Sequence, residues 1–209
     1  MTERICIINW KGGCGKTTIA TTLAVALAAR GLATGLADYD RQKTAKSWAK
    51  LRPNDAIPLS AFDWREHFGA HPKSLERLII DCPPSLRAKG VRAVIAECKV
   101  VVIPLLPSSF DEMATLRFVK RLTAMKPVRE GKTHLLLVAN RYRSDRRSSQ
   151  MLEDFLVANT MLLVAQIPER EIYSDLARKG LTIFDGHTKP SIDQQQAWLP
   201  LIRAVEMET

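Results

Sequence analysis

Residues 9–18 read Asn9-Trp10-Lys11-Gly12-Gly13-Cys14-Gly15-Lys16-Thr17-Thr18, and they join an apolar run at 4–8 to a helical pattern at 17–30. Glycines at such a strand-to-helix turn let backbone N–H groups point at an anion, and the helix N-terminus adds its positive end. Lys16 is then placed to reach the β and γ oxygens of a triphosphate, and Thr17 to hold Mg²⁺. The segment therefore predicts a phosphate-binding loop.

Short apolar runs alternate with helical patterns along the rest of the chain. Buried strands are predicted at 4–8, 33–37, 78–80, 100–104, 135–139 and 162–167. Helices are predicted at 17–30, 44–51, 91–97, 109–125, 148–159 and 172–179, with one more at 192–207. Prolines interrupt 52–73, where only 63–68 is predicted to be helical. This alternation indicates an α/β fold with a doubly wound, mainly parallel sheet flanked by helices.

Composition and charge narrow the class of protein. The 209 residues include 46% hydrophobic and 25% charged residues, so a single globular domain over 1–209 is expected. The apolar runs are much shorter than the roughly 20 residues of a membrane-spanning helix. The four cysteines form no C-x-x-C pair, and the first residues show no secretory signal, so a cytoplasmic protein is predicted.

Two further acidic segments follow predicted strands. Asp38 and Asp40 end the second strand, and Asp81 ends the third. A carboxylate beside a phosphate loop can hold a water molecule on Mg²⁺, which is the role expected of Asp81. A helix N-cap is the alternative for Asp81, and the following Pro83-Pro84 fits it poorly. Asp40 lies at the sheet edge where ligands bind in open α/β sheets.

The loop at 9–18 differs from the common pattern G-x-x-x-x-G-K-[ST], because Trp10 occupies its first position. It matches K-G-G-x-G-K-[ST] and resembles the ParA/MinD group of deviant Walker A ATPases. The resemblance is closest to the small ParA subgroup typified by ParF, which lacks an N-terminal helix-turn-helix domain. It spans nearly the whole chain and rests also on 38–42, 78–84, 102–104, 107–108, 139–141, 167–170, Tyr173 and 179–180.

The resemblance implies a P-loop NTPase that hydrolyses ATP with Mg²⁺. Lys11 would reach across a nucleotide-sandwich homodimer to the partner's phosphates, Lys16 would bind phosphate, and Asp40 would orient the attacking water. Asp38 would support the switch or serve only as a hydrogen-bonding residue. Thr17 would bind the metal, and Asp81 would do so through water. The remaining nucleotide-binding residues would be Gly12, Gly13, Cys14, Gly15, Thr18, Asn140 and Pro168.

Asn140 has two interpretations. Its amide carries both a donor and an acceptor, which suits reading an adenine edge. A residue that closes the strand in an Asx-turn is the alternative.

The basic excess gives a net charge of +9 and favours contacts with nucleic-acid phosphates. The resemblance implies non-specific DNA binding on the nucleoid by the ATP dimer. A solvated basic face and contact with RNA are the alternatives. The candidate DNA-binding residues are Arg141, Arg143, Arg146, Arg147, Arg170, Arg178 and Lys179.

The function that the resemblance implies is positioning or segregation of a cargo. The cargo would be a plasmid or a protein assembly such as carboxysomes or chemosensory arrays, and a ParB-like adaptor would stimulate hydrolysis. One alternative is a metabolic or redox P-loop enzyme of the nitrogenase-iron-protein or small-ligase type. Another is membrane patterning in the manner of MinD, but the acidic chain end at 201–209 does not fit a basic amphipathic membrane helix, so no membrane contact is predicted.

Overall fold

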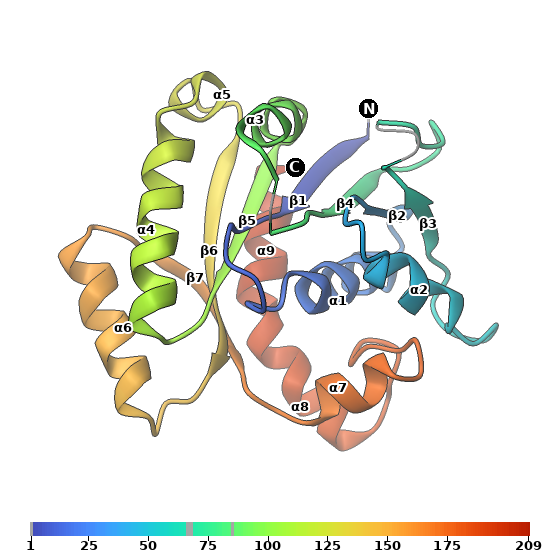
Figure 1. The fold of residues 1–209 in the computed structure, drawn as a ribbon. Helices are drawn as coiled ribbons and strands as arrows, with labels where there is room; N and C mark the ends of the chain where they lie inside the picture. Colours follow the sequence, from blue (N-terminus) through green and yellow to red (C-terminus); the bar gives the residue numbers. More distant parts are fainter. Residues whose placement is uncertain (1, 66–68, 85) are drawn as a thin grey trace.

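The computed structural model describes residues 2–65, 69–84 and 86–209. Its centre is a parallel sheet with the strand order β3-β2-β4-β1-β5-β6-β7 (Figure 1). The strands are β1 Glu3–Ile7, β2 Thr34–Asp38, β3 Ser60–Asp63, β4 Arg77–Asp81, β5 Val100–Leu105, β6 His134–Tyr142 and β7 Leu163–Pro168. Because β2, β3 and β4 lie on one side of β1 and β5, β6 and β7 lie on the other, the doubly wound α/β class is confirmed.

Helices cover both faces of the sheet (Figure 1). On one face lie α1 Lys16–Ala28, α2 Thr44–Lys50, α7 Ile172–Ala177, α8 Lys189–Gln195, a 3₁₀ turn Gln196–Trp198 and α9 Leu199–Glu208. On the other face lie α3 Ala88–Glu97, α4 Ser109–Thr123, α5 Lys126–Arg129 and α6 Arg147–Ala158. Each face has its own apolar core, and the sheet separates the two.

Helix α1 holds the phosphate loop in place because it is buried along almost its whole length. Ile19, Leu23 and Leu27 are all inaccessible to solvent. The helix contacts β1, β2 and β4 beneath it, and α2 and α9 beside it. A helix enclosed in this way needs apolar residues on every side, which explains its run of alanine, leucine and valine.

The structure differs from the sequence prediction in three places. Residues 60–63 form the edge strand β3, although Asp63 was predicted to begin a helix; Trp64 and Arg65 lie in a turn, and 66–68 fall outside the described residues. Helix α5 was not predicted. The single predicted helix at 192–207 is wrong, because the segment consists of α8, a 3₁₀ turn and α9. Pro190 and Pro200 lie in the first turns of α8 and α9. Proline is tolerated there because the N–H groups of the first turn have no hydrogen-bond partner within the helix.

Strand β3 pairs with β2, and a glycine on β2 gives its side chains room. Gly35 on β2 lies opposite Ser60, and a Cβ atom built on Gly35 would be 2.8 Å from Cε2 of Phe62. Because Gly35 has no side chain, there is room for the Phe62 ring at the sheet edge.

Among the described helices, none is long and apolar enough to cross a bilayer.

Candidate functional site

The phosphate loop follows β1 and adopts the conformation that its glycines allow. Gly13 and Gly15 have φ values of 78° and 89°, in the left-handed region where a side chain is strained. A Cβ atom on Gly15 would also lie 2.0 Å from Nδ2 of Asn140. That amide donates a hydrogen bond to the Cys14 carbonyl at 2.9 Å. Asn140 thus braces the loop from the end of β6, so its observed role combines packing and hydrogen bonding.

Lys16 lies folded over the loop. Its side chain is buried, and its Nζ donates to the carbonyl oxygen of Lys11 at 2.9 Å. The Cys14 sulfur lies 4.0 Å from the same nitrogen. An ammonium has three N–H donors, so this position leaves Lys16 able to bind a phosphate placed in the loop.

Thr17 and Asp81 meet beside the loop. The Thr17 hydroxyl donates to Oδ2 of Asp81 at 2.7 Å. Asp81 is 1% exposed, and its Oδ1 finds no hydrogen-bond partner among the described residues. Burial raises the pKa of Asp81 to about 7. The hydrogen bond from Thr17 opposes this rise, and the nearby charge of Asp38 adds to it.

A magnesium ion fits this pair. The Thr17 hydroxyl and the unpartnered Asp81 oxygen are the hard oxygen donors that Mg²⁺ prefers. Among the described residues, no group of three or more His, Cys, Asp and Glu side chains comes together to hold an ion. Magnesium is commonly bound by one or two protein ligands together with water and phosphate oxygens, and the donors here suit that mode.

Asp38 has hydrogen bonds that account for its position. It is 1% exposed; its Oδ1 accepts from the Asp40 N–H at 2.9 Å, and its Oδ2 accepts from the Lys46 N–H at 2.8 Å. Burial raises its pKa, and these two N–H donors oppose the rise. Asp38 therefore ties the end of β2 to α2. Asp40 is half-buried, and one of its oxygens accepts from the Gln42 N–H at 3.0 Å.

Lys11 has an ionic partner that the sequence analysis missed. Its Nζ lies 3.8 Å from Oδ2 of Asp111, whose side chain is only 7% exposed. Asp111 is in the first turn of α4, where the helix dipole favours a carboxylate, and its Oδ1 finds no hydrogen-bond partner among the described residues. In the sequence, Asp111 could have been noticed as an acidic residue that follows the strand ending at Leu105, in the segment Pro107-Ser108-Ser109-Phe110-Asp111.

A cavity of about 1090 Å³ opens beside the loop at the carboxyl ends of β6 and β7. It brings Gly15, Thr17 and Thr18 together with Asn140 and Pro168, five of the residues predicted to bind nucleotide. Helices α2 and α7 supply much of the remaining lining. The other lining residues are Thr21, Thr44, Trp48, Arg141, Arg143, Glu169, Arg170, Glu171, Tyr173, Ser174, Ala177 and Arg178.

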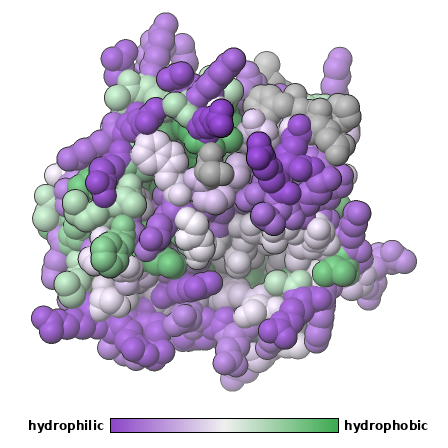
Figure 2. Space-filling view, in the orientation of Figure 1, coloured by the Kyte–Doolittle hydropathy of each residue, from purple (hydrophilic) through white to green (hydrophobic). Residues whose placement is uncertain are grey.

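The candidate DNA-binding residues fall into two sets. Arg141, Arg143, Arg170 and Arg178 line the cavity, whereas Arg146, Arg147 and Lys179 are exposed outside its lining. Hydrophilic side chains dominate the lower edge of the molecule, over the start of α6 and over α7 (Figure 2). Residues far apart in the sequence, on α6 and α7, thus contribute to one edge of the protein.

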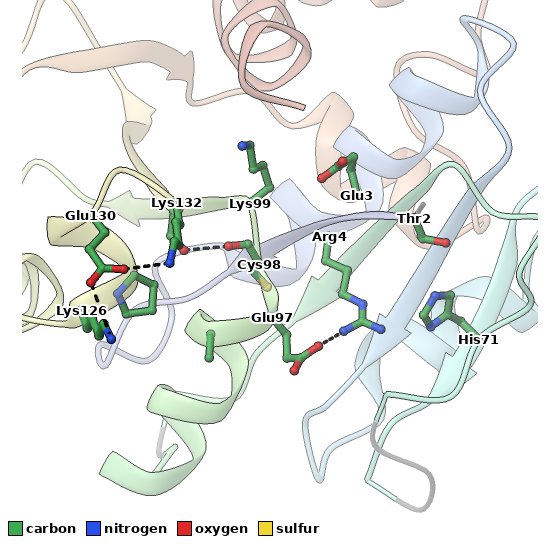
Figure 3. Close-up of a pocket in the computed structure, with 13 residues that line it drawn as sticks. Thr2, Glu3, Arg4, His71, Glu97, Cys98, Lys99, Lys126, Glu130 and Lys132 are labelled. Carbon is green, nitrogen blue, oxygen red and sulfur yellow. Dashed lines mark hydrogen bonds and ion pairs between the residues drawn. The ribbon is translucent and has the colours of Figure 1, made fainter.

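A second cavity, of about 640 Å³, lies at the amino ends of β1 and β5 (Figure 3). Its basic side chains are largely paired: Arg4 contacts Glu97, and Lys126 and Lys132 both contact Glu130. No residue of the phosphate loop lines it. The cavity beside the loop is therefore the candidate site.

Residues 5–183 match the family profile described as CobQ/CobB/MinD/ParA nucleotide binding domain. Two relatives are both named maintenance of carboxysome distribution protein A. The protein from Halothiobacillus neapolitanus is 27% identical over 86% of each chain. The protein from Gloeobacter kilaueensis is 33% identical over 69% of this chain and 64% of the relative. A plasmid partition protein of Borrelia burgdorferi, solved with AMPPNP, shares the fold with a TM-score of 0.73 and 18% identity, over 98% of this chain and all of that one. These matches confirm the resemblance to the ParA/MinD group. The chain belongs to the CobQ/CobB/MinD/ParA family of nucleotide-binding domains.

Proposed function

We propose that this protein is a ParA-type ATPase that dimerises on ATP and positions or segregates a cargo inside the cell. The observation that carries the proposal is the Lys11–Thr17 loop, whose Thr17 hydroxyl is bonded to the buried Asp81 at the edge of a nucleotide-sized cavity. The two relatives named for carboxysome distribution and the plasmid partition protein support the cargo-positioning role. A protein assembly and a plasmid are the two kinds of cargo that these names suggest.

The chemistry proposed for the site is hydrolysis of ATP to ADP and phosphate. The N–H groups of residues 12–18 and the Lys16 ammonium would hold the phosphates, and Thr17, together with Asp81 through a water molecule, would hold Mg²⁺. The ion, when bound, would neutralise charge on the β and γ phosphates. Asp40, at the end of β2 on the same edge of the sheet, would orient the attacking water.

Dimerisation is proposed to depend on Lys11. Its side chain is 40% exposed and pairs with Asp111 at 3.8 Å, a separation that gives only a modest ionic interaction. Two triphosphates held face to face repel each other, and a lysine donated from each subunit to the other's phosphates offsets that repulsion. Lys11 would therefore exchange Asp111 for the partner's phosphates when the dimer forms.

Non-specific DNA binding on the nucleoid is proposed for the ATP dimer. The net charge of +9 and the exposed Arg146 and Arg147 at the start of α6 support electrostatic contacts with phosphates. Arg170 lies just before α7, and Arg178 and Lys179 lie just after it. An adaptor protein linked to the cargo would stimulate hydrolysis and release the dimer from DNA.

Two rival functions find less support in the described residues. A bridging metal cluster, as in a nitrogenase-type reductase, needs accessible cysteines, whereas Cys6, Cys82 and Cys98 are all buried in the protein core. A membrane-binding end needs a free apolar helix face, whereas α9 packs its apolar residues Leu201, Ile202 and Val205 against the sheet.

The proposal is tested by the mass of the protein in ATP and in ADP, measured by light scattering. Asp40→Ala is used alongside the wild type, because slow hydrolysis would let the ATP dimer accumulate. We expect twice the monomer mass with Mg·ATP and the monomer mass with Mg·ADP. A monomer in both nucleotides for both proteins would contradict the proposed switch.

A further inference from the structure

Two helices supply lining residues to the cavity beside the phosphate loop, and these two parts of the lining are called its walls here. Thr44 and Trp48 of α2 line one side, and Tyr173 and Ala177 of α7 line the other. Gly15, Thr17 and Thr18, from the phosphate loop and the start of α1, line the same cavity and are called its floor here. A nucleotide whose phosphates lie on this floor must place its nucleoside in the remaining space, so the spacing of the walls bears on how the nucleoside fits.

A buried ion pair joins the ends of these walls. Arg52 follows α2, and its two terminal nitrogens donate to Asp185 Oδ1 at 2.7 Å and Oδ2 at 3.2 Å. The same nitrogens donate to the carbonyl oxygens of Gly180 and Ile57 at 2.9 and 2.6 Å. The Arg52 and Asp185 side chains are only 7% and 3% exposed. Asp185 also accepts from the N–H and hydroxyl of Thr182, at 2.8 and 3.0 Å.

Backbone contact reinforces this junction. Gly180, just after α7, has a φ of 68°, and a Cβ atom there would lie 2.5 Å from Arg52 N and 2.5 Å from Leu51 C. Only glycine lets the end of α2 and the end of α7 approach so closely. The Arg52 guanidinium also lies 5.0 Å from the ring centre of Trp48, which is itself part of the cavity wall.

Helix α2 is consequently fixed at both ends. At its start, the Lys46 N–H donates to Asp38, next to the proposed catalytic residue Asp40. At its end, Arg52 is bonded to Asp185 in the segment after α7. Since neither Arg52 nor Asp185 lines the cavity, any effect of the pair on a ligand must pass through the helices that it joins.

We propose that Arg52 and Asp185 are positioning residues that set the distance between the α2 and α7 walls, and thereby the fit of the nucleoside half of the nucleotide. This inference rests on the proposed nucleotide-binding function. The inference can be distinguished from the proposed function by comparing two ligands that would both bind at the phosphate loop. Loss of the pair should weaken binding of Mg·ATP, whereas binding of Mg²⁺ tripolyphosphate, which has no nucleoside, should change little.

The experiment is calorimetric titration of the full chain with both ligands. For Arg52→Met we expect about tenfold weaker ATP binding and less than about threefold weaker tripolyphosphate binding, because a displaced wall would misplace the nucleoside and leave the phosphate loop unchanged. Arg52→Lys keeps the charge but loses the two-pronged contact, so it should restore part of the ATP affinity. Arg30→Met is the control, because one terminal nitrogen of Arg30 donates to both carboxylate oxygens of Glu206 and neither residue lines the cavity.

Gly180→Ala provides a second variant that keeps both charges but pushes the two chain segments apart. It should show the same selective loss of ATP binding, and circular dichroism would establish that both variants are folded. Equal affinity of Arg52→Met and the wild type for ATP would overturn the inference, as would an equal loss for both ligands. A wild-type protein that binds tripolyphosphate but not ATP, or neither ligand, would overturn the proposed function as well.

Discussion

The hydroxyl of Thr17 and the carboxylate of Asp81 are 2.7 Å apart, and this hydrogen bond joins the first turn of α1 to the end of β4. Asp81 keeps one oxygen without a hydrogen-bond partner among the described residues, although its side chain is buried. Burying a carboxylate in this way reduces the stability of the protein unless a cation is bound nearby. A loss of folding stability at this position is expected of a site that holds a metal ion.

Asp81→Asn should therefore stabilise the protein in the absence of nucleotide and metal. Burial raises the Asp81 pKa to about 7, so the folded wild type binds more protons than the unfolded chain, and its stability should fall as the pH rises from about 4 to about 7. The variant should lack this fall and gain about 1–3 kcal/mol at pH 8. Urea unfolding across this pH range is the measurement, and an unchanged pH profile in the variant would contradict the explanation.

Lys16→Ala should abolish ATP binding. Lys16 is the cation folded over the phosphate loop, and its Nζ lies 2.9 Å from the Lys11 carbonyl, within reach of a phosphate oxygen bound there. Calorimetry with Mg·ATP gives the affinity, and a thermal melt shows whether the variant is folded. A folded variant with wild-type affinity would mean that the loop does not bind phosphate.

Asp40→Ala should retain ATP binding and lose hydrolysis. Orienting a water molecule matters in the transition state and contributes little to ground-state binding, so the rate constant should fall while the affinity is preserved. Phosphate release is measured together with ATP affinity. Asp55→Ala, which changes an exposed aspartate in the loop after α2, is the control. Wild-type turnover by Asp40→Ala would exclude Asp40 as the water-positioning residue.

Lys11→Ala should bind ATP as a monomer and fail to dimerise. The substitution removes an ionic contact at 3.8 Å to Asp111 from a lysine that is 40% exposed, so the folded monomer should lose about 1 kcal/mol of stability or less. The dimer, in contrast, would lose the charge that offsets two apposed triphosphates. Analytical ultracentrifugation in Mg·ATP distinguishes the two states, with Lys120→Ala on the exposed face of α4 as control. A Lys11→Ala dimer as stable as that of the wild type would refute this role.

The sequence predicted the parts of the fold that rest on continuous apolar runs. Strands β1, β4 and β5 lie within one residue of their predicted positions, because the central residues of each are buried and apolar. Strand β3 was missed because an edge strand of four residues, Ser60–Asp63, carries a weak apolar signal. The segment at 192–207 was predicted as one helix because apolar spacing does not reveal a break near Pro200.

The site was predictable where a local motif carries it. The loop at 11–17 and the acidic strand ends predicted Lys16, Thr17 and Asp81, and the structure brings Thr17 and Asp81 into direct contact. Contacts between segments that are distant in the chain produce no recognisable motif in the sequence. The Lys11–Asp111 pair spans two separate elements, and Arg52 and Asp185 are 133 residues apart in the chain. Such pairs arise from the packing of α2, α4 and the segment after α7, which no single stretch of sequence specifies.

The central claim, that ATP switches the protein onto DNA, is tested most directly by its affinity for a duplex of arbitrary sequence in ATP and in ADP over a series of salt concentrations. Because a dimer presents two basic faces, we expect tighter binding in ATP and a salt dependence about twice as steep, with a slope of roughly 0.9 per phosphate neutralised. Replacing Arg146 and Arg147, which lie outside the cavity lining, by glutamate should weaken DNA binding without changing ATP affinity. Equal affinity and equal salt dependence of the wild type in ATP and ADP would contradict the account.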